Sequence, residues 1–193
     1  CHFLLFSKKI LEKAGGLDPA YDGAQDHEFV LRCRAKGAKF HHIPKILYHW
    51  RVHPASTAYD PCSKLYAYEN GKKAILNYLN NQGVQAKVSL TKDLGIYRIN
   101  YTHNRLMHVA VLVAKQEQLW QLKGMTKVSK RTEVTYHYAP KQNNKEIEKR
   151  NADYIVMVGE GMEPQGENWL EELLGFCQER RVGAVSGRIF NKK

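Results

Sequence analysis

The sequence is poor in cysteine and has no long apolar run. Its four cysteines (Cys1, Cys33, Cys62, Cys177) form no Cys-x-x-Cys pair and no His spacing suited to zinc. Neither a disulfide framework nor a structural metal site is therefore predicted, and a reducing, cytoplasmic setting is expected. No apolar stretch approaches the roughly 18 to 20 residues that a membrane span needs, and the first ten residues lack signal-peptide architecture.

The chain also lacks an initiator methionine, since it begins at Cys1 and ends on Lys193. We interpret it as a piece of a longer protein. With 193 residues, of which 43% are hydrophobic, it has enough apolar material for one ordinary domain or two small halves.

Acidic residues are in deficit, because 19 Asp and Glu stand against 30 Lys and Arg and give a net charge of +11. Such a charge is typical of proteins that bind nucleic acid. The basic residues are nevertheless spread along the chain, without an RNA-binding or helix-turn-helix signature. Specific nucleic-acid binding is therefore not predicted, and contact with nucleotide phosphates or an anionic membrane surface fits the charge equally well.

A glycine turn followed by an acidic helix start organises the first half. Gly15 and Gly16 end a short helix predicted from Ser7 to Ala14, and Asp18-Pro19 prevents its continuation. From Gln25 to Lys36 the apolar residues recur at helical spacing, with acidic residues in the first turn where the helix dipole favours them. The pattern places Asp26 at a junction between loop and helix.

These residues resemble a known family. The Gly-Gly-Leu-Asp turn, the short loop and Gln25-Asp26 resemble the acceptor-side motif of the inverting family 2 glycosyltransferases, which have a GT-A fold. The segment 43–56, which reads IPKILYHWRVHPAS, is similar to the next segment of that family at the expected distance. The resemblance covers roughly residues 1 to 90.

The second half alternates strands and helices. Strands are predicted at 109–114, 133–138, 154–158 and 182–187, with helices at 116–123, 141–150 and 168–180 between them. Earlier in the chain, a long helix is predicted over 61–81, and extended runs over 39–43 and 46–50 and then over 84–90 and 96–101. The alternation predicts an α/β layer with parallel strands.

The second half resembles the nucleotide-binding half of the same family, best from Asn151 to Val185. In the family, the strand before the Trp-Leu-Glu-Glu-Leu helix ends in an Asp-rich motif that holds a divalent metal, Mg²⁺ or Mn²⁺, on the sugar nucleotide. This chain has Gly159-Glu160-Gly161 at that position. Glu160 is a weak residual ligand at most, because a hard cation asks for two or more oxygen ligands. We therefore interpret this half as degenerate.

The expected fold class is α/β, GT-A-like, which is a Rossmann-like nucleotide-diphospho-sugar transferase fold with a mostly parallel sheet and flanking helices. The halves stand in permuted order: residues 1–95 correspond to the acceptor-side half and 96–193 to the nucleotide-binding half. The simplest interpretation is the end of one domain joined to the start of the next in a tandem protein, and a permuted single domain is the alternative.

Asp26 is the candidate catalytic residue. Inverting transfer needs a general base that takes the proton of the acceptor hydroxyl, and a carboxylate at a junction between loop and helix suits that role. The structural alternative is that Asp26 only caps the helix. The resemblance also assigns Gln25 to substrate binding.

Further substrate-binding residues are implied in the segment after the helix. His49, Arg51 and His53 alternate, so an extended chain places them on one face. The resemblance places Arg51 and His53 near the diphosphate, whose oxygens match a guanidinium fork, and adds His49 and Ser56 to substrate binding. The structural alternative is a solvated face of an edge strand.

The sequence thus predicts a glycosyltransferase fragment that transfers a sugar from a nucleotide-sugar donor to a growing cell-surface glycan, at the cytoplasmic face of the membrane. The first rival is a non-catalytic module that binds carbohydrate or a partner, and the second is a basic module for nucleic acid or a lipid surface. The absence of interleaved aromatic and basic residues weakens the second rival.

Overall fold

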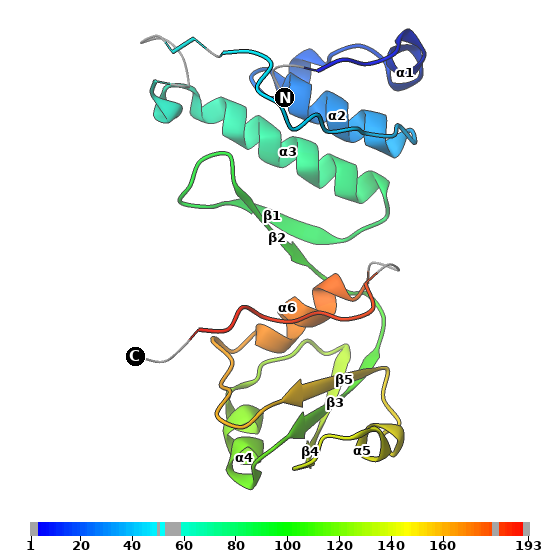
Figure 1. Ribbon diagram of the computed structural model, residues 1–193, viewed down its shortest axis with the longest axis vertical. Coiled ribbons are helices and arrows are strands. Elements are labelled where there is room, and N and C mark those ends of the chain that lie inside the picture. The colour runs from blue at the N-terminus through cyan, green and yellow to red at the C-terminus, as the bar shows by residue number, and fades with distance from the viewer. Residues whose placement is uncertain (1–3, 50, 53–58, 179–181, 191–193) are drawn as a thin grey trace. The chain divides into compact units, whose positions relative to one another are not determined.

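The computed structural model describes residues 4–49, 51–52, 59–178 and 182–190. The chain forms two compact units, unit 1 from Cys1 to Asn100 and unit 2 from Tyr101 to Lys193. Figure 1 shows helices gathered in the first unit and a small sheet with its helices in the second.

Unit 1 is a layer of three helices with a hairpin. Its elements are α1 (Lys8–Ala14), the 3-10 turn η1 (Pro19–Tyr21), α2 (Gln25–Ala35), the 3-10 turn η2 (Pro61–Lys64), α3 (Leu65–Asn81), β1 (Ala86–Leu90) and β2 (Tyr97–Tyr101), whose last residue begins unit 2. The Ser7 hydroxyl caps α1 by accepting from the Ile10 N–H at 3.3 Å. Gly15 ends α1 with a φ of 83°, so the predicted helix and its glycine stop are confirmed.

The core of unit 1 lies where α1 and α2 meet. Phe29 and Cys33 are buried there with Ala14, and Ile10 and Leu11 pack against them. The apolar face predicted for α2 is thus confirmed. On the other side of the layer, α3 buries Ala74 and Leu79, and β1 buries Val88.

Unit 2 is a parallel sheet with flanking helices. Its elements are β3 (Met107–Val113), α4 (Gln116–Met125), β4 (Thr132–Tyr138), α5 (Asn144–Glu148), β5 (Tyr154–Val158) and α6 (Trp169–Phe176). The strand order is β4-β3-β5, and β3 is parallel to both neighbours. The predicted α/β class with parallel strands is confirmed, and the arrangement is consistent with a Rossmann-like fold.

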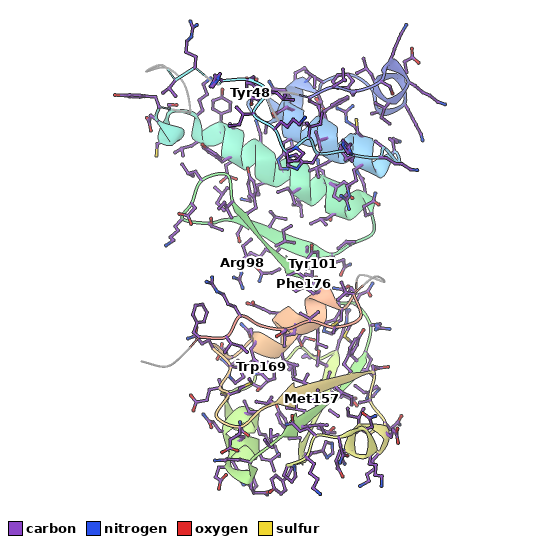
Figure 2. The ribbon with its side chains drawn as sticks, viewed as in Figure 1. Tyr48, Arg98, Tyr101, Met157, Trp169 and Phe176 are labelled. Atoms are coloured by element: carbon purple, nitrogen blue, oxygen red, sulfur yellow. The ribbon has the colours of Figure 1, made fainter. Side chains whose placement is uncertain are left out.

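The central strand β3 is buried on both faces, which explains its continuous apolar sequence. Met107, Val109, Val111 and Val113 lie in one cluster with Leu122 of α4 and with Leu170 and Leu174 of α6. Trp169, which begins α6, packs on the edge of this cluster, and Met157 of β5 is exposed (Figure 2).

Three predicted extended runs are not strands in the described chain. The runs 39–43, 46–49 and 182–187 have no regular secondary structure. A strand requires a partner as well as a β-forming sequence, and these runs pair with no strand among the described residues. Trp50, the last residue of the second run, lies outside the described residues.

Candidate functional site

The loop before α2 is fastened to α3 at three points. The Tyr21 hydroxyl pairs with the side-chain amide of Asn77, and the Asn70 amide donates to the Asp22 carbonyl at 2.8 Å. Gly23 has a φ of 78°, and a Cβ placed there would lie 2.7 Å from Cβ of Ala67. The loop therefore enters α2 along one defined path.

Arg32 fixes the other end of the loop. Its guanidinium donates to the Ala14 carbonyl at 2.6 Å and to the Gly16 carbonyl at 2.8 Å. It also donates to both carboxylate oxygens of Glu28, at 2.8 and 2.7 Å. Because the hydrogen bond and charge of Glu28 outweigh burial, the pKa of Arg32 is raised. One fixed cation thus joins the end of α1, the glycine turn and α2.

Asp26 and Gln25 lie in the first turn of α2, which this frame holds. Ala24 occupies the N-cap position without a side-chain hydrogen bond, so Asp26 is not the N-cap residue. Its Oδ1 accepts from the His27 N–H at 2.8 Å, and the side chain is half-buried. Oε1 of Gln25 is buried and has no hydrogen-bond partner among the described residues. A buried acceptor of this kind is suited to a donor from a bound molecule.

His27, next to Asp26, packs on the hairpin. Its ring stacks on Tyr97 with 6.2 Å between centroids, and the Tyr97 hydroxyl donates to the Tyr68 carbonyl at 3.1 Å. Burial lowers the pKa of His27, although the neighbouring charge of Asp26 acts against this effect. His27 therefore belongs to the contact between α2 and the hairpin rather than to the side on which Asp26 is half-exposed.

The substrate-binding residues predicted after α2 are only partly described. His49 and Arg51 are exposed on the extended segment that follows residue 37. His53 and Ser56 lie outside the described residues. Gln25 and Asp26 are neighbours in the sequence, and their juxtaposition with the remaining four predicted residues stays a prediction.

The carboxyl ends of the strands in unit 2 are closed by two glutamines. In open parallel sheets, ligands bind at the carboxyl ends of the strands. The buried Gln118 amide donates to the carbonyls of Gly159 and Met162 at 2.9 and 3.2 Å. The Gln142 amide donates to the carbonyls of Leu112 and Val158 at 3.1 and 2.8 Å. Side chains of the unit itself therefore occupy the edge.

Glu160 lies at this same edge and is paired. Its Oε1 lies 2.6 Å from Nζ of Lys115, and both side chains are exposed. The hydrogen bond and charge of Glu160 raise the pKa of Lys115. An ammonium group thus stands where a cation would have to approach the one carboxylate. These residues do not fit a divalent metal, and the described residues contain no group of three metal-ligating side chains.

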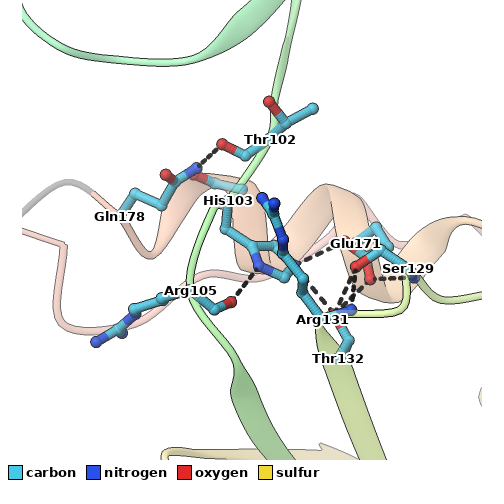
Figure 3. A network of polar contacts seen from close by, with 9 residues as sticks. Thr102, His103, Arg105, Ser129, Arg131, Thr132, Glu171 and Gln178 are labelled. Carbon is cyan, nitrogen blue, oxygen red and sulfur yellow. Dashed lines mark hydrogen bonds and ion pairs between the residues drawn. The ribbon is translucent and has the colours of Figure 1, made fainter.

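A second polar network lies at the opposite edge of the sheet (Figure 3). His103 is buried, with Nδ1 3.0 Å from the Arg105 carbonyl and Nε2 2.9 Å from Oε2 of Glu171. Oε1 of Glu171 accepts from the Thr132 hydroxyl at 2.6 Å and from the Ser129 N–H at 2.9 Å. Since Thr132 begins β4, the network marks the amino ends of the strands. We assign it to stability, because ligands of such sheets bind at the carboxyl ends.

Several of these residues were not predicted from the sequence. The spacing of Glu28 and Arg32 by four positions is a signal for an ion pair. The contacts of Arg32 with Ala14 and Gly16 carry no such signal, and neither do those of Asn70, Asn77 or Gln118. They join residues 16 to 56 positions apart in the chain.

Among the described residues, no helix is long and apolar enough to cross a membrane.

Two known proteins match almost the whole chain. One is an uncharacterized protein, y4gI, of Sinorhizobium fredii, which is 22% identical over 98% of this chain and 25% of its own length. The other is the O-antigen biosynthesis protein RfbC of Myxococcus xanthus, which is 24% identical over 97% of this chain and 18% of its own length. The chain thus spans a quarter or less of the length of these relatives. No family model and no solved structure matches the sequence.

Proposed function

We propose that the chain is part of a glycosyltransferase of polysaccharide biosynthesis and that unit 1 supplies its acceptor side. The main support is the first turn of α2, where a half-buried carboxylate follows directly in the sequence on a residue whose buried amide oxygen has no partner among the described residues, on a frame fixed by Arg32. The distant similarity to an O-antigen biosynthesis protein supports the same process. The cytoplasmic face of the membrane, where nucleotide sugars are present, is the proposed location.

In the proposed reaction, Asp26 takes the proton of an acceptor hydroxyl while its oxygen attacks the anomeric carbon of the donor. The new bond joins that oxygen to the anomeric carbon, and the bond from this carbon to the diphosphate breaks with inversion. Oε1 of Gln25 accepts a hydrogen bond from a second hydroxyl and thereby orients the acceptor. Arg51 and His53 bind the leaving diphosphate, with His49 and Ser56 beside them, as the family resemblance implies.

Unit 2 has a different proposed role. Because Gln118 and Gln142 close its carboxyl edge and Lys115 neutralises Glu160, we assign it to binding a partner or a glycan rather than to catalysis. This is the second candidate function for the chain as a whole, and a single experiment separates the two.

The experiment compares three variants of the full-length protein with the wild type. It measures the release of nucleoside diphosphate from UDP-, GDP- and dTDP-sugars, and membranes supply the acceptor. Asp26→Asn keeps the oxygen that accepts from His27 but cannot take a proton, so turnover should fall by about 10² to 10⁴. Asp22→Asn, an exposed change in the same loop, is the matched control. Glu160→Gln tests unit 2 and should leave turnover unchanged.

Turnover of Asp26→Asn within about tenfold of the wild type would contradict the assignment of the base. A large loss with Glu160→Gln would instead place catalysis in unit 2. No release by the wild-type protein with any of these sugars would favour the binding module.

A further inference from the structure

Unit 1 carries a groove of mixed apolar and polar lining whose charged residues are all basic. The groove has a volume of about 490 Å³ and lies between α1, α2 and the extended chain on either side of them. Phe6, Phe29 and Phe40 contribute its aromatic surface, and the charged residues that line it are Lys9, Lys13, Lys36 and Lys39. Among its described lining residues there is no Asp or Glu.

Apolar side chains protrude into water both at the groove and on the segment that follows it in the chain. Leu5 is 97% exposed and Ile46 is 89% exposed. Ile43, Leu47 and Tyr48 are also exposed on the extended segment, where Figure 2 labels Tyr48. Single exposed apolar residues are common on soluble proteins, but a contiguous group marks an interaction surface.

The charge of this surface is strongly one-sided. Residues 4–13 and 36–49 together contain six lysines and one acidic residue, Glu12. Glu12 lies 3.8 Å from Lys8 in an exposed ion pair. The partner of this surface must therefore supply negative charge and an apolar environment together.

We propose that this surface of unit 1 docks on the anionic surface of a phospholipid bilayer. An anionic bilayer attracts each nearby lysine, and protruding side chains such as Leu5 and Ile46 enter the boundary between headgroups and acyl chains. An acidic protein partner would instead need pockets to receive side chains that stand fully in water. The inference goes beyond the proposed function and does not depend on Asp26.

The test measures co-sedimentation of the full chain with vesicles of pure phosphatidylcholine and of equal parts phosphatidylcholine and phosphatidylglycerol. The wild-type chain should bind the anionic vesicles and should lose that binding as salt rises. The triple change Lys9→Glu, Lys36→Glu and Lys39→Glu should weaken partitioning more than tenfold, since each lysine near the surface contributes about 1 kcal/mol.

The matched control is the triple change Lys123→Glu, Lys130→Glu and Lys141→Glu. These lysines are exposed in unit 2, and the change in net charge is the same. The control should keep most of the wild-type binding. An equal loss in both triples would overturn the proposal, because binding would then follow overall charge alone.

Leu5→Ser tests whether apolar side chains contribute to membrane binding. The change should not affect the stability of the fold, because the Leu5 side chain is almost fully exposed. It should weaken binding to anionic vesicles, whereas Ile189→Ser, at a 70% exposed position in unit 2, should not. Equal binding of Leu5→Ser and wild type would overturn insertion. A stable dimer without vesicles that Leu5→Ser dissociates would show that a second copy covers the surface, and would equally overturn the proposal.

Discussion

Replacing Glu171 with Gln should destabilise unit 2 while leaving unit 1 intact. One carboxylate oxygen accepts hydrogen bonds from the Thr132 hydroxyl and the Ser129 N–H, and the other lies 2.9 Å from Nε2 of His103. Nδ1 of His103 lies against the Arg105 carbonyl, and Nε2 also lies 3.0 Å from the Thr132 hydroxyl. A Gln side chain carries no charge and keeps only one of the two acceptor oxygens, so it cannot reproduce both sets of contacts.

The expected loss is about 2 to 4 kcal/mol in the free energy of unfolding at neutral pH, because a charged, partly buried acceptor becomes neutral and one of its two oxygens is replaced by a donor group. Urea unfolding followed by tryptophan fluorescence measures it, since Trp120 and Trp169 both lie in unit 2. Its midpoint should fall by roughly 1 M or more. Glu172→Gln, an exposed change in the same helix, is the control and should cost less than about 0.5 kcal/mol.

The effect should also depend on pH. Burial alone would raise the pKa of Glu171, but the hydrogen bonds from Thr132 and Ser129 and the charge of His103 together lower it below its ordinary value of 4.5. A carboxylate with a lowered pKa stabilises the fold fully above 4.5, and this contribution is lost as the pH falls through the lower value of the folded state. Wild type and Glu171→Gln should therefore converge in acid. Equal stability of the two at pH 7 would refute the reasoning.

Two further changes test unit 1. Gly71→Ala places a Cβ 2.1 Å from the Tyr97 hydroxyl and should lower the free energy of unfolding, measured by thermal unfolding, by about 1 to 3 kcal/mol. The control is Gly124→Ala, where no atom lies within 4 Å of the added Cβ, and it should be neutral or stabilising. Equal effects of the two changes would contradict the tight contact at Gly71. A lysine at position 32 cannot donate to both carbonyls and to Glu28 at once, so Arg32→Lys should make hydrogen exchange of the amides in the Gly15–Gly16 turn faster. The exposed change Arg34→Lys is the control and should not alter this exchange. Slow exchange in both variants would show that other contacts hold the turn.

The elements that could be predicted from the sequence are those determined by local contacts. Ser7 and Gly15 mark the two ends of α1, and the spacing of Phe29 and Cys33 marks the buried face of α2. The continuous apolar sequence of β3 likewise predicts a strand covered on both faces. Each of these signals lies within one helix or one strand, where cap preferences and periodicity act directly.

The parts that failed depend on distant partners. The runs 39–43, 46–49 and 182–187 have β-forming sequences, but the described chain offers them no strand to pair with. In the candidate site, the position of Asp26 at a helix start was predictable from Gly15 to Gln25. The contacts that hold that start, from Arg32 to Gly16 and from Asn70 to Asp22, were not, because no local pattern encodes a bond to a distant backbone carbonyl.

The two glutamines at the carboxyl ends of the strands in unit 2 make a ligand site there energetically costly. Gln118 and Gln142 together satisfy four backbone carbonyls, those of Gly159, Met162, Leu112 and Val158. A smaller side chain at either position would open space but would remove two hydrogen bonds, at about 0.5 to 1.5 kcal/mol for each. A ligand that entered at this end of the sheet would therefore have to donate hydrogen bonds to the same carbonyls to offset that loss.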